Sequence, residues 1–229
     1  MSNSSLGKSS IGRKVIMALS GFFLLFFLLQ HLLINFLSVV RPDAFNEVSH
    51  FMGTNPLVQF LLQPVLLFGV LFHLIMGMVL DAQNKKARPV KYIVDNQAAN
   101  APWVSRNMLI TGIMIMLFLA VHFYDFWIPE VNTKFIQQDW TGMHNGEFRY
   151  YAELVHKMSD PIRSSIYTIA FVFLSLHLQH GFTSAFQSVG FKHNKYTPTL
   201  QKLGKLYAIV VPALFIVIAW FHVINGGAH

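Results

Sequence analysis

Long uncharged stretches dominate the hydropathy pattern of this chain. The first, from Val15 to Val40, contains no charged side chain. A run of about 20 apolar residues is long enough to cross the hydrocarbon core of a bilayer as a helix. Four further apolar runs follow, so the pattern predicts an all-α integral membrane protein of a single domain. Its five predicted spans cover about 13–40, 56–81, 105–127, 162–189 and 203–225.

Composition supports this class. Hydrophobic residues make up 54% of the 229 residues and charged residues 12%, whereas soluble domains carry about 25% charged residues. The chain has no cysteine, which excludes disulfides, thiolate metal sites and covalent haem attachment. The first apolar run follows Lys8, Arg13 and Lys14 as a signal peptide would, but it is too long and lacks a cleavage site. We therefore expect it to be retained as the first span.

The distribution of positive charge predicts the orientation. The net charge of +7 comes mostly from residues beside the apolar runs, which indicates membrane topology rather than nucleic-acid binding. The N-terminus and the connections after spans two and four are basic, and the other two connections mix acids with few basic residues. The positive-inside rule then places the N-terminus inside and the C-terminus outside a cytoplasmic (inner) membrane. The basic residues of the two inner connections are Lys85, Lys86, Arg88, Lys91, Arg106, Lys192, Lys195, Lys202 and Lys205.

Each predicted span carries a histidine, and in four of them the depth forms a pattern. At a rise of about 1.5 Å per residue, His31 and His122 lie about 24 to 27 Å from the inner start of their spans. His73 and His177 lie about 25 Å from the outer start of theirs. The first two therefore belong to an outer level and the second two to an inner level. Histidines inside a bilayer are costly and usually functional.

Two internal repeats accompany these histidines. In the first repeat, Ser20-Gly21 precedes His31 by the same interval that separates Thr111-Gly112 from His122. In the second repeat, a glycine follows each histidine four residues later: Gly77 follows His73, and Gly181 follows His177. Helical geometry turns Ser20 and Thr111 toward the inner level, about 16 Å from the histidines on their own helices. The glycines remove bulk where a wide, flat group would approach the backbone.

Paired neutral imidazoles on facing helices suit the axial ligation of haem iron. We expect the other ring nitrogen of each histidine to donate to the carbonyl four residues earlier; these carbonyls belong to Phe27, Gly69, Phe118 and Phe173. A zinc site is the competing explanation, but it needs three or four ligands at one point, usually with a carboxylate or thiolate, and no span interior offers either. Each histidine alone is also explained by a hydrogen bond to a neighbouring helix.

The chain resembles the dihaem, five-span cytochrome b anchor of the succinate:quinone oxidoreductases, which include the quinol:fumarate reductases. The resemblance covers all five spans. It rests on Leu29-Gln30-His31-Leu32 with Asn35, Ala44-Phe45-Asn46 with His50-Phe51-Met52, the spacing from Thr111-Gly112 to His122, and His177 with Gly181 and Gly190.

The resemblance implies a set of ligands. It assigns His31 and His122 to the outer of two b haems, and His73 and His177 to the inner one. The histidine-x3-glycine spacing selects His177 over His180, which we expect to bond a haem propionate, a quinone or water. His222 is expected to be a packed polar residue.

The resemblance also implies that a quinone reacts near the outer connection of spans one and two. His50 and Glu47 are the candidates for proton transfer there. The acidic quinone-site residue of the family has no clear match.

The function implied is electron transfer between membrane quinone, expected to be menaquinone, and a flavoprotein with an iron–sulfur subunit docked on the cytoplasmic face. The direction, succinate oxidation or fumarate reduction, stays open, as does an oligomer of the whole complex. Two alternatives remain. One is the dihaem quinol-oxidising anchor of a hydrogenase or formate dehydrogenase, and the other is a transporter that uses the histidines as a relay. A transporter usually needs broken helices and intramembrane carboxylates, which the sequence does not make evident.

Overall fold

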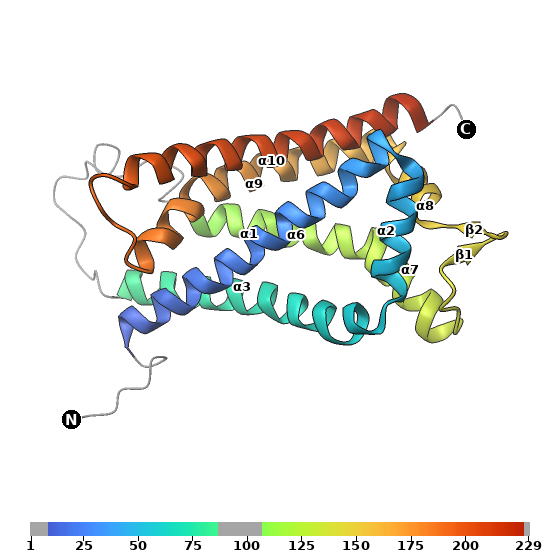
Figure 1. The fold of residues 1–229 in the computed structure, drawn as a ribbon. Helices are drawn as coiled ribbons and strands as arrows, with labels where there is room; N and C mark the ends of the chain where they lie inside the picture. The colour runs from blue at the N-terminus through green and yellow to red at the C-terminus, as the bar shows by residue number, and fades with distance from the viewer. Residues whose placement is uncertain (1–8, 87–106, 227–229) are drawn as a thin grey trace.

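In the part of the chain that the structure describes, five long helices lie side by side in a bundle (Figure 1). The computed structural model describes residues 9–86 and 107–226. Each of the five helical stretches is long and apolar enough to cross a membrane, so the chain is a multi-pass, all-α membrane protein. The predicted basic residues Lys8, Arg88, Lys91 and Arg106 lie outside the described residues. The bundle helices are α1 (Ser10–Val40), α3 (Gln63–Lys86), α6 (Met108–His122), α9 (Pro161–Ser188) and α10 (Thr197–Asn225).

Local sequence sets where these helices begin. Ser9 caps α1, since its side chain accepts a hydrogen bond from the Gly12 amide at 2.9 Å. Asp160 caps α9 in the same way, at 2.9 Å from the Ile162 amide, with a proline as the first helical residue. Both caps satisfy amide groups that have no partner within the helix.

Two of the spanning helices contain wide π turns. The turn η1 (Val58–Leu62) precedes α3, and η2 (Phe123–Trp127) joins α6 to α7 (Ile128–Val131). Pro64 follows η1 and Pro129 follows η2. A proline has no amide hydrogen to donate, and a π turn is one way for a helix to continue around it. A third π turn, η3 (Asn132–Ile136), extends the helix beyond α7.

Three predicted helix limits differ from the structure by five residues or more. The third spanning helix continues to Ile136 instead of ending at 127, because the charged residues that suggested its end have partners in the folded chain. The second continues to Lys86 rather than 81, and Asp81 pairs with Lys85 one turn later at 2.7 Å. The fifth begins at Thr197 rather than 203.

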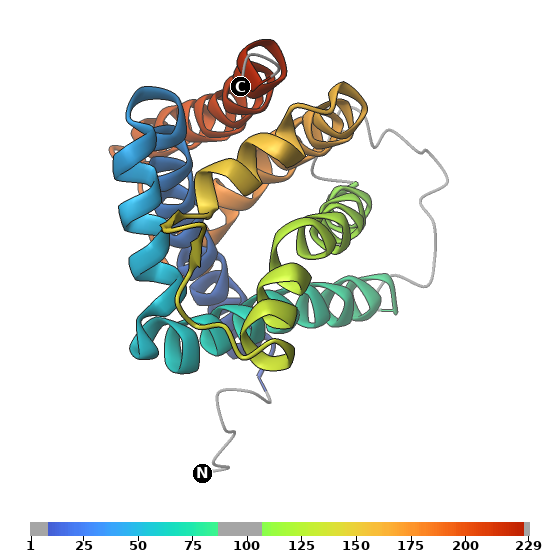
Figure 2. The same ribbon diagram turned by 90° about the vertical axis from the view of Figure 1, so that its right-hand side faces the viewer.

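Shorter elements cover one end of the bundle, which we call the cap end; the opposite end is the loop end. The helix α2 (Pro42–Thr54) runs across the cap end, beside α8 (Tyr150–Met158) and a hairpin of β1 (Met143–His144) and β2 (Glu147–Phe148). Figure 2 looks onto this end. The cap end corresponds to the side that the sequence predicts to be outside.

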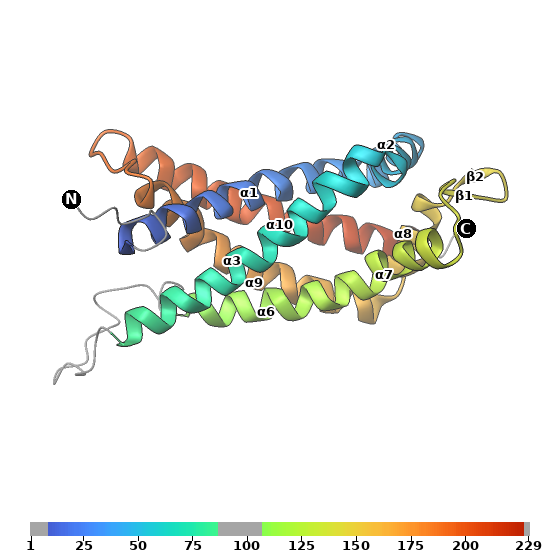
Figure 3. The ribbon, with the colours of Figure 1, turned by 90° about the horizontal axis from the view of Figure 1, so that it is seen from below.

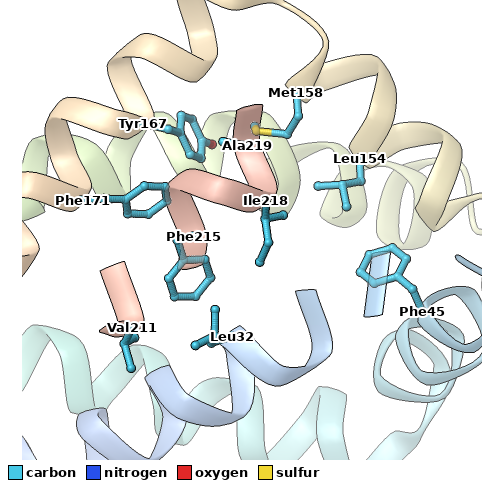
Figure 4. Packing of buried hydrophobic residues seen from close by; sticks show 10 residues of the cluster. All are labelled: Leu32, Phe45, Leu154, Met158, Tyr167, Phe171, Val211, Phe215, Ile218 and Ala219. Carbon is cyan, nitrogen blue, oxygen red and sulfur yellow. The ribbon is translucent and has the colours of Figure 1, made fainter. Parts of the chain in front are cut away.

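The packed core lies toward the cap end and between α1, α9 and α10. Ten buried side chains, drawn in Figure 4, form it. Aromatic rings are stacked within it, with the rings of Phe171 and Phe215 5.2 Å apart. The helix α3 contributes no buried residue; it packs against α1 and α6 at the side of the bundle, as Figure 3 shows. The core members are Leu32, Phe45, Leu154, Met158, Tyr167, Phe171, Val211, Phe215, Ile218 and Ala219.

Candidate functional site

The structure brings the four histidines together in the two pairs that the sequence predicts. His31 on α1 faces His122 on α6, with ring centroids 5.8 Å apart and ring planes at 84°. His73 on α3 faces His177 on α9 at 6.4 Å and 70°. The first pair lies toward the cap end and the second toward the loop end. At each of the two depths, a histidine from one helix therefore faces a histidine from another helix.

At the loop-end pair, the Ser20 hydroxyl contacts one ring nitrogen of His73. The Ser20 Oγ atom donates to the Met17 carbonyl at 2.8 Å and lies 3.0 Å from the Nδ1 atom of His73. With the hydroxyl hydrogen donated to the carbonyl, the oxygen is free to accept a hydrogen from the Nδ1 atom of the tautomer that is protonated there. The Nε2 atom of a neutral His73 then carries the free lone pair, which is the form a metal-ligating imidazole takes.

Thr111 repeats this arrangement for His177. Its Oγ1 atom donates to the Met108 carbonyl at 2.9 Å and lies 3.2 Å from the Nδ1 atom of His177. Thr111 is fully buried, so its hydroxyl has no competing water. The sequence prediction that Ser20 and Thr111 face the inner level agrees with both contacts.

Glycines extend the same symmetry. A Cβ atom added at Gly21 would lie 3.6 Å from the Cε1 atom of His73, and one added at Gly112 would lie 3.7 Å from Cε1 of His177. One turn beyond each histidine, a Cβ at Gly77 would meet the methyl of Met17 at 3.5 Å, and one at Gly181 the methyl of Met108 at 3.3 Å. The α1–α3 and α6–α9 halves thus have matched contacts around the loop-end pair.

His122 has a different partner at the cap-end pair. The Tyr167 hydroxyl lies 3.5 Å from its Nδ1 atom and donates to the Oδ2 atom of Asp125 at 2.9 Å. The phenol oxygen is again left to accept from Nδ1–H. Asp125 is buried, and its other oxygen is ion-paired with Arg163.

At His31 the neighbouring group is an amide NH2, which donates hydrogen bonds and so does not accept from Nδ1–H as the hydroxyls can. The Asn35 Nδ2 atom lies 3.3 Å from His31 Nδ1 and donates to the His31 carbonyl at 2.8 Å. Rings of Phe27 and Phe215 lie 5.5 and 5.7 Å from the imidazole. They give this histidine an apolar surround.

The expected carbonyl partners are therefore wrong for three of the four histidines. His73, His177 and His122 contact hydroxyl groups on a neighbouring helix instead of the carbonyls of Gly69, Phe173 and Phe118. In an α-helix, the carbonyl four residues earlier already accepts the backbone amide of the same residue. A hydroxyl from the next helix reaches the ring without competing for that bond.

The residues present fit a bis-histidine haem. Metal–imidazole bonds are about 2.0 Å long, so two rings on opposite sides of one metal have centroids about 6.3 Å apart. The observed separations of 5.8 and 6.4 Å lie close to this value. In residues 9–86 and 107–226, no three histidine or acidic side chains gather as a metal-binding group.

The two remaining span histidines have polar neighbours of their own. His180 Nε2 lies 3.0 Å from the Ser184 hydroxyl one turn along α9. His222 is 1% exposed, and its Nε2 atom lies 2.9 Å from the buried Ser38 hydroxyl of α1. The prediction that His222 is a packed polar residue agrees with this contact.

In the cap, the rings of His50 and Tyr150 lie close together, with centroids 6.3 Å apart, and the side chain of Glu47 is exposed. The Nδ1 atom of His50 and the hydroxyl of Tyr150 are both buried without a hydrogen-bond partner. Both pack against the backbone of Gly142: an added Cβ there would lie 2.8 Å from the first atom and 2.7 Å from the second. Glu47 is exposed on α2. Burial and the nearby Glu130 raise the pKa of Tyr150 to about 12.

A network of buried charges joins the cap to the third helix. Lys134 is 1% exposed. Its ammonium group donates to the Gly53 carbonyl and, at 2.9 Å, to the Oε1 atom of Gln59. It also forms an ion pair with Glu130 at 2.5 Å. Arg149 pairs with Glu130 and with Glu153. Burial alone would lower the pKa of Arg149, but its hydrogen bonds to the two carboxylates outweigh burial and raise it. The network explains why the helix continues through a charged segment.

Sequence reasoning missed Asp125, Tyr167 and Tyr150. Asp125 could have been noticed in the sequence, because it is a carboxylate three residues after His122 in an apolar run. Nothing in the sequence pointed to the two tyrosines, because their positions relative to the histidines depend on how separate helices pack.

Comparisons with protein-family models, with curated proteins and with solved structures return no match to this chain.

Proposed function

We propose that this chain is a dihaem cytochrome b, the membrane anchor of a succinate:quinone oxidoreductase. The observation that carries the proposal is the arrangement of four histidines in two facing pairs, with Nδ1 of three rings held by hydroxyl oxygens. When Nδ1–H donates to these oxygens, the Nε2 lone pairs of His73, His177 and His122 are free for a metal. Bilayer-buried histidines with this geometry suit haem better than a structural role.

His31 and His122 would hold one haem, and His73 and His177 the other. Bound haem supplies one-electron redox chemistry. Ser20, Thr111 and Tyr167 fix the tautomers of the ligands and orient their rings. The aromatic side chains around the cap-end pair exclude water; among them, Phe118 and Phe126 lie 5.8 and 5.3 Å from the His122 ring. The two levels are about 16 Å apart along α1.

The loop end would face the cytoplasm and receive the flavoprotein and iron–sulfur subunits. Exposed lysines gather at this end around the connection from α9 to α10: Lys192, Lys195, Lys202 and Lys205. Their excess over acidic residues supports both the inward orientation and a soluble partner of complementary charge.

Quinone would react at the cap end, next to the His31–His122 pair. Quinone reduction consumes two protons, and His50 remains the leading candidate to supply one. The structure places Tyr150 beside it as a second unpartnered hydrogen-bonding group. Glu47 is a candidate only for exchange with solvent, because its side chain is exposed.

The proposal is tested by the haem content of purified protein. We expect a b-type spectrum with two haems per chain. His73→Ala and His177→Ala should each lose the same haem, and His31→Ala and His122→Ala the other. The matched control is His222→Ala, a buried histidine outside the pairs, which should keep both haems. A colourless preparation, or loss of one haem from members of different pairs, would contradict the proposal.

Two observations bear on the transporter alternative. Asp125 is a buried carboxylate inside the predicted third span, and the third helix contains π turns, which the sequence did not make evident. Asp125 is nevertheless held by Arg163 and Tyr167, so it is not a free relay group. Subunits that co-purify with the chain would separate a succinate dehydrogenase or fumarate reductase from the anchor of a hydrogenase or formate dehydrogenase.

A further inference from the structure

A chain of polar side chains leads from His122 to the side of the bundle. It runs from the His122 ring to the Tyr167 hydroxyl at 3.5 Å, then to Asp125 at 2.9 Å, and ends at the ion pair between Asp125 and Arg163. Asp125 is 2% exposed and Tyr167 4% exposed. Since the Tyr167 hydroxyl donates to Asp125, its oxygen can accept from His122, and in that tautomer the chain runs from His122 through Tyr167 to Asp125.

Arg163 forms the outer end of this chain. It lines a crevice of about 390 Å³ between α6 and α9, together with Val121, Tyr124 and Ile166. The crevice is otherwise mostly apolar and opens on the side of the bundle. The carboxylate of Asp125 is buried, and its ion pair with Arg163 links it to the lining of this crevice.

The loop-end pair has no such charged group in its hydrogen-bond chain. Ser20 and Thr111 pass their hydrogens to the backbone carbonyls of Met17 and Met108, and both chains end there on neutral groups. The two ligand pairs thus have similar ring separations but different second partners. Ligand hydrogen bonding is one of the means by which a protein sets the potential of a haem.

We infer that Tyr167 and Asp125 are positioning residues that lower the reduction potential of the cap-end haem. The inference rests on the proposed function. An acceptor on Nδ1–H makes the ligating nitrogen more basic and so favours oxidised iron. The buried carboxylate behind the phenol accepts its hydrogen and so strengthens the phenol oxygen as an acceptor, while Arg163 balances the negative charge of the carboxylate. Arg163 keeps that carboxylate ionised and in place.

The test is an equilibrium redox titration of the purified protein with both haems bound. Tyr167→Phe removes the acceptor, and we expect the ratio of reduced to oxidised cap-end haem at a fixed ambient potential to rise at least threefold. Asp125→Asn keeps an acceptor for Tyr167 and removes the charge, and it should shift the ratio in the same direction. Asp125→Glu should return it toward the original value. The loop-end haem should not respond to any of the three.

Tyr207→Phe is the matched control. Tyr207 also donates across helices, to the Leu25 carbonyl at 2.6 Å, and its removal should leave both potentials unchanged. The low-temperature electron paramagnetic resonance spectrum of the oxidised cap-end haem gives a second readout. This spectrum should change in Tyr167→Phe and stay unchanged in Tyr207→Phe.

Unchanged potentials in Tyr167→Phe and Asp125→Asn, with both haems present, would overturn this inference and leave the proposed function intact. Equal shifts of both haems would also overturn it, because they indicate a general structural effect. If Tyr167→Phe does not fold, Asp125→Asn and Asp125→Glu decide the matter. A parent protein without haem would overturn the proposed function as well.

Discussion

The Ser20 hydroxyl on α1 lies 3.0 Å from the Nδ1 atom of His73 on α3. The same relation recurs between Thr111 on α6 and His177 on α9 at 3.2 Å. In both cases the hydroxyl residue is followed by a glycine and its hydrogen is donated to the carbonyl three residues earlier. The loop-end pair is therefore held by two equivalent helix pairs, and each half of the bundle contributes one histidine to each level.

Removing either hydroxyl should weaken the loop-end haem alone. We expect Ser20→Ala and Thr111→Val to lower its affinity about 10- to 100-fold, as is typical when the partner of a ligating histidine is lost. Thr111→Ser should retain it, because the hydroxyl is kept. The measurement is the haem content of each variant, resolved by redox titration. Ser188→Ala is the control, since that hydroxyl bonds only to the Ser184 carbonyl; a loss of equal size in the control would contradict the assignment.

The size of the side chain at position 112 should have a graded effect. A Cβ atom at Gly112 would lie 3.7 Å from Cε1 of His177, which is ordinary van der Waals contact. Gly112→Ala should therefore keep the loop-end haem. Gly112→Val adds two methyl groups that reach the ring, and more than half of that haem should be lost while the cap-end haem stays. Equal haem content in both variants would show that the ring does not depend on this glycine.

Truncating Lys134 should destabilise the cap. Its ammonium group has three acceptors in a buried site, and removing one partner of a buried ion pair costs about 3 kcal/mol or more. We expect Lys134→Ala to lower the thermal midpoint and to speed proteolysis between 137 and 158. Lys85→Ala is a matched control, because Lys85 forms an exposed pair with Asp81 and should cost less than about 1 kcal/mol. Similar effects in both variants would contradict a structural role for the buried network.

Alkaline conditions should loosen the cap through Tyr150. The pKa of this phenol is raised to about 12 in the folded chain, first by burial and then by Glu130, from an ordinary value near 10. The folded chain then holds the proton longer than the unfolded chain. The stabilisation that the protonated phenol gives the folded chain is complete below about pH 10 and is lost as the pH rises toward 12.

For a half-buried phenol, we expect this loss to be below about 2 kcal/mol. Hydrogen exchange in α8 and the hairpin, compared at pH 9 and pH 11, would measure it. Tyr150→Phe should respond less to the change in pH than the parent protein. Tyr196→Phe, which alters an exposed tyrosine at the other end, should behave as the parent does. A Tyr150→Phe variant with unchanged alkaline sensitivity would contradict the assignment.

Particular residues show how far the sequence could predict the fold. The apolar runs give the five spanning helices because a bilayer requires long uncharged helices whatever packs beside them. The limits of the third helix could not be predicted, since its charged residues are stable only with partners from elsewhere in the chain. Lys134, for example, is buried because Gly53 and Gln59 supply acceptors from a segment about 80 residues away.

The number of spans, the two levels and the pairing of His31 with His122 and of His73 with His177 all follow from the spacing of residues along the chain. Helical rise converts residue number directly into depth, so these features need no knowledge of packing. Tertiary structure alone decided which groups contact the rings: hydroxyls from neighbouring helices instead of carbonyls of the same helix, and a tyrosine backed by an ion pair at His122. Side chains on separate helices meet only through the rotation and crossing of those helices, which sequence spacing within one helix does not specify.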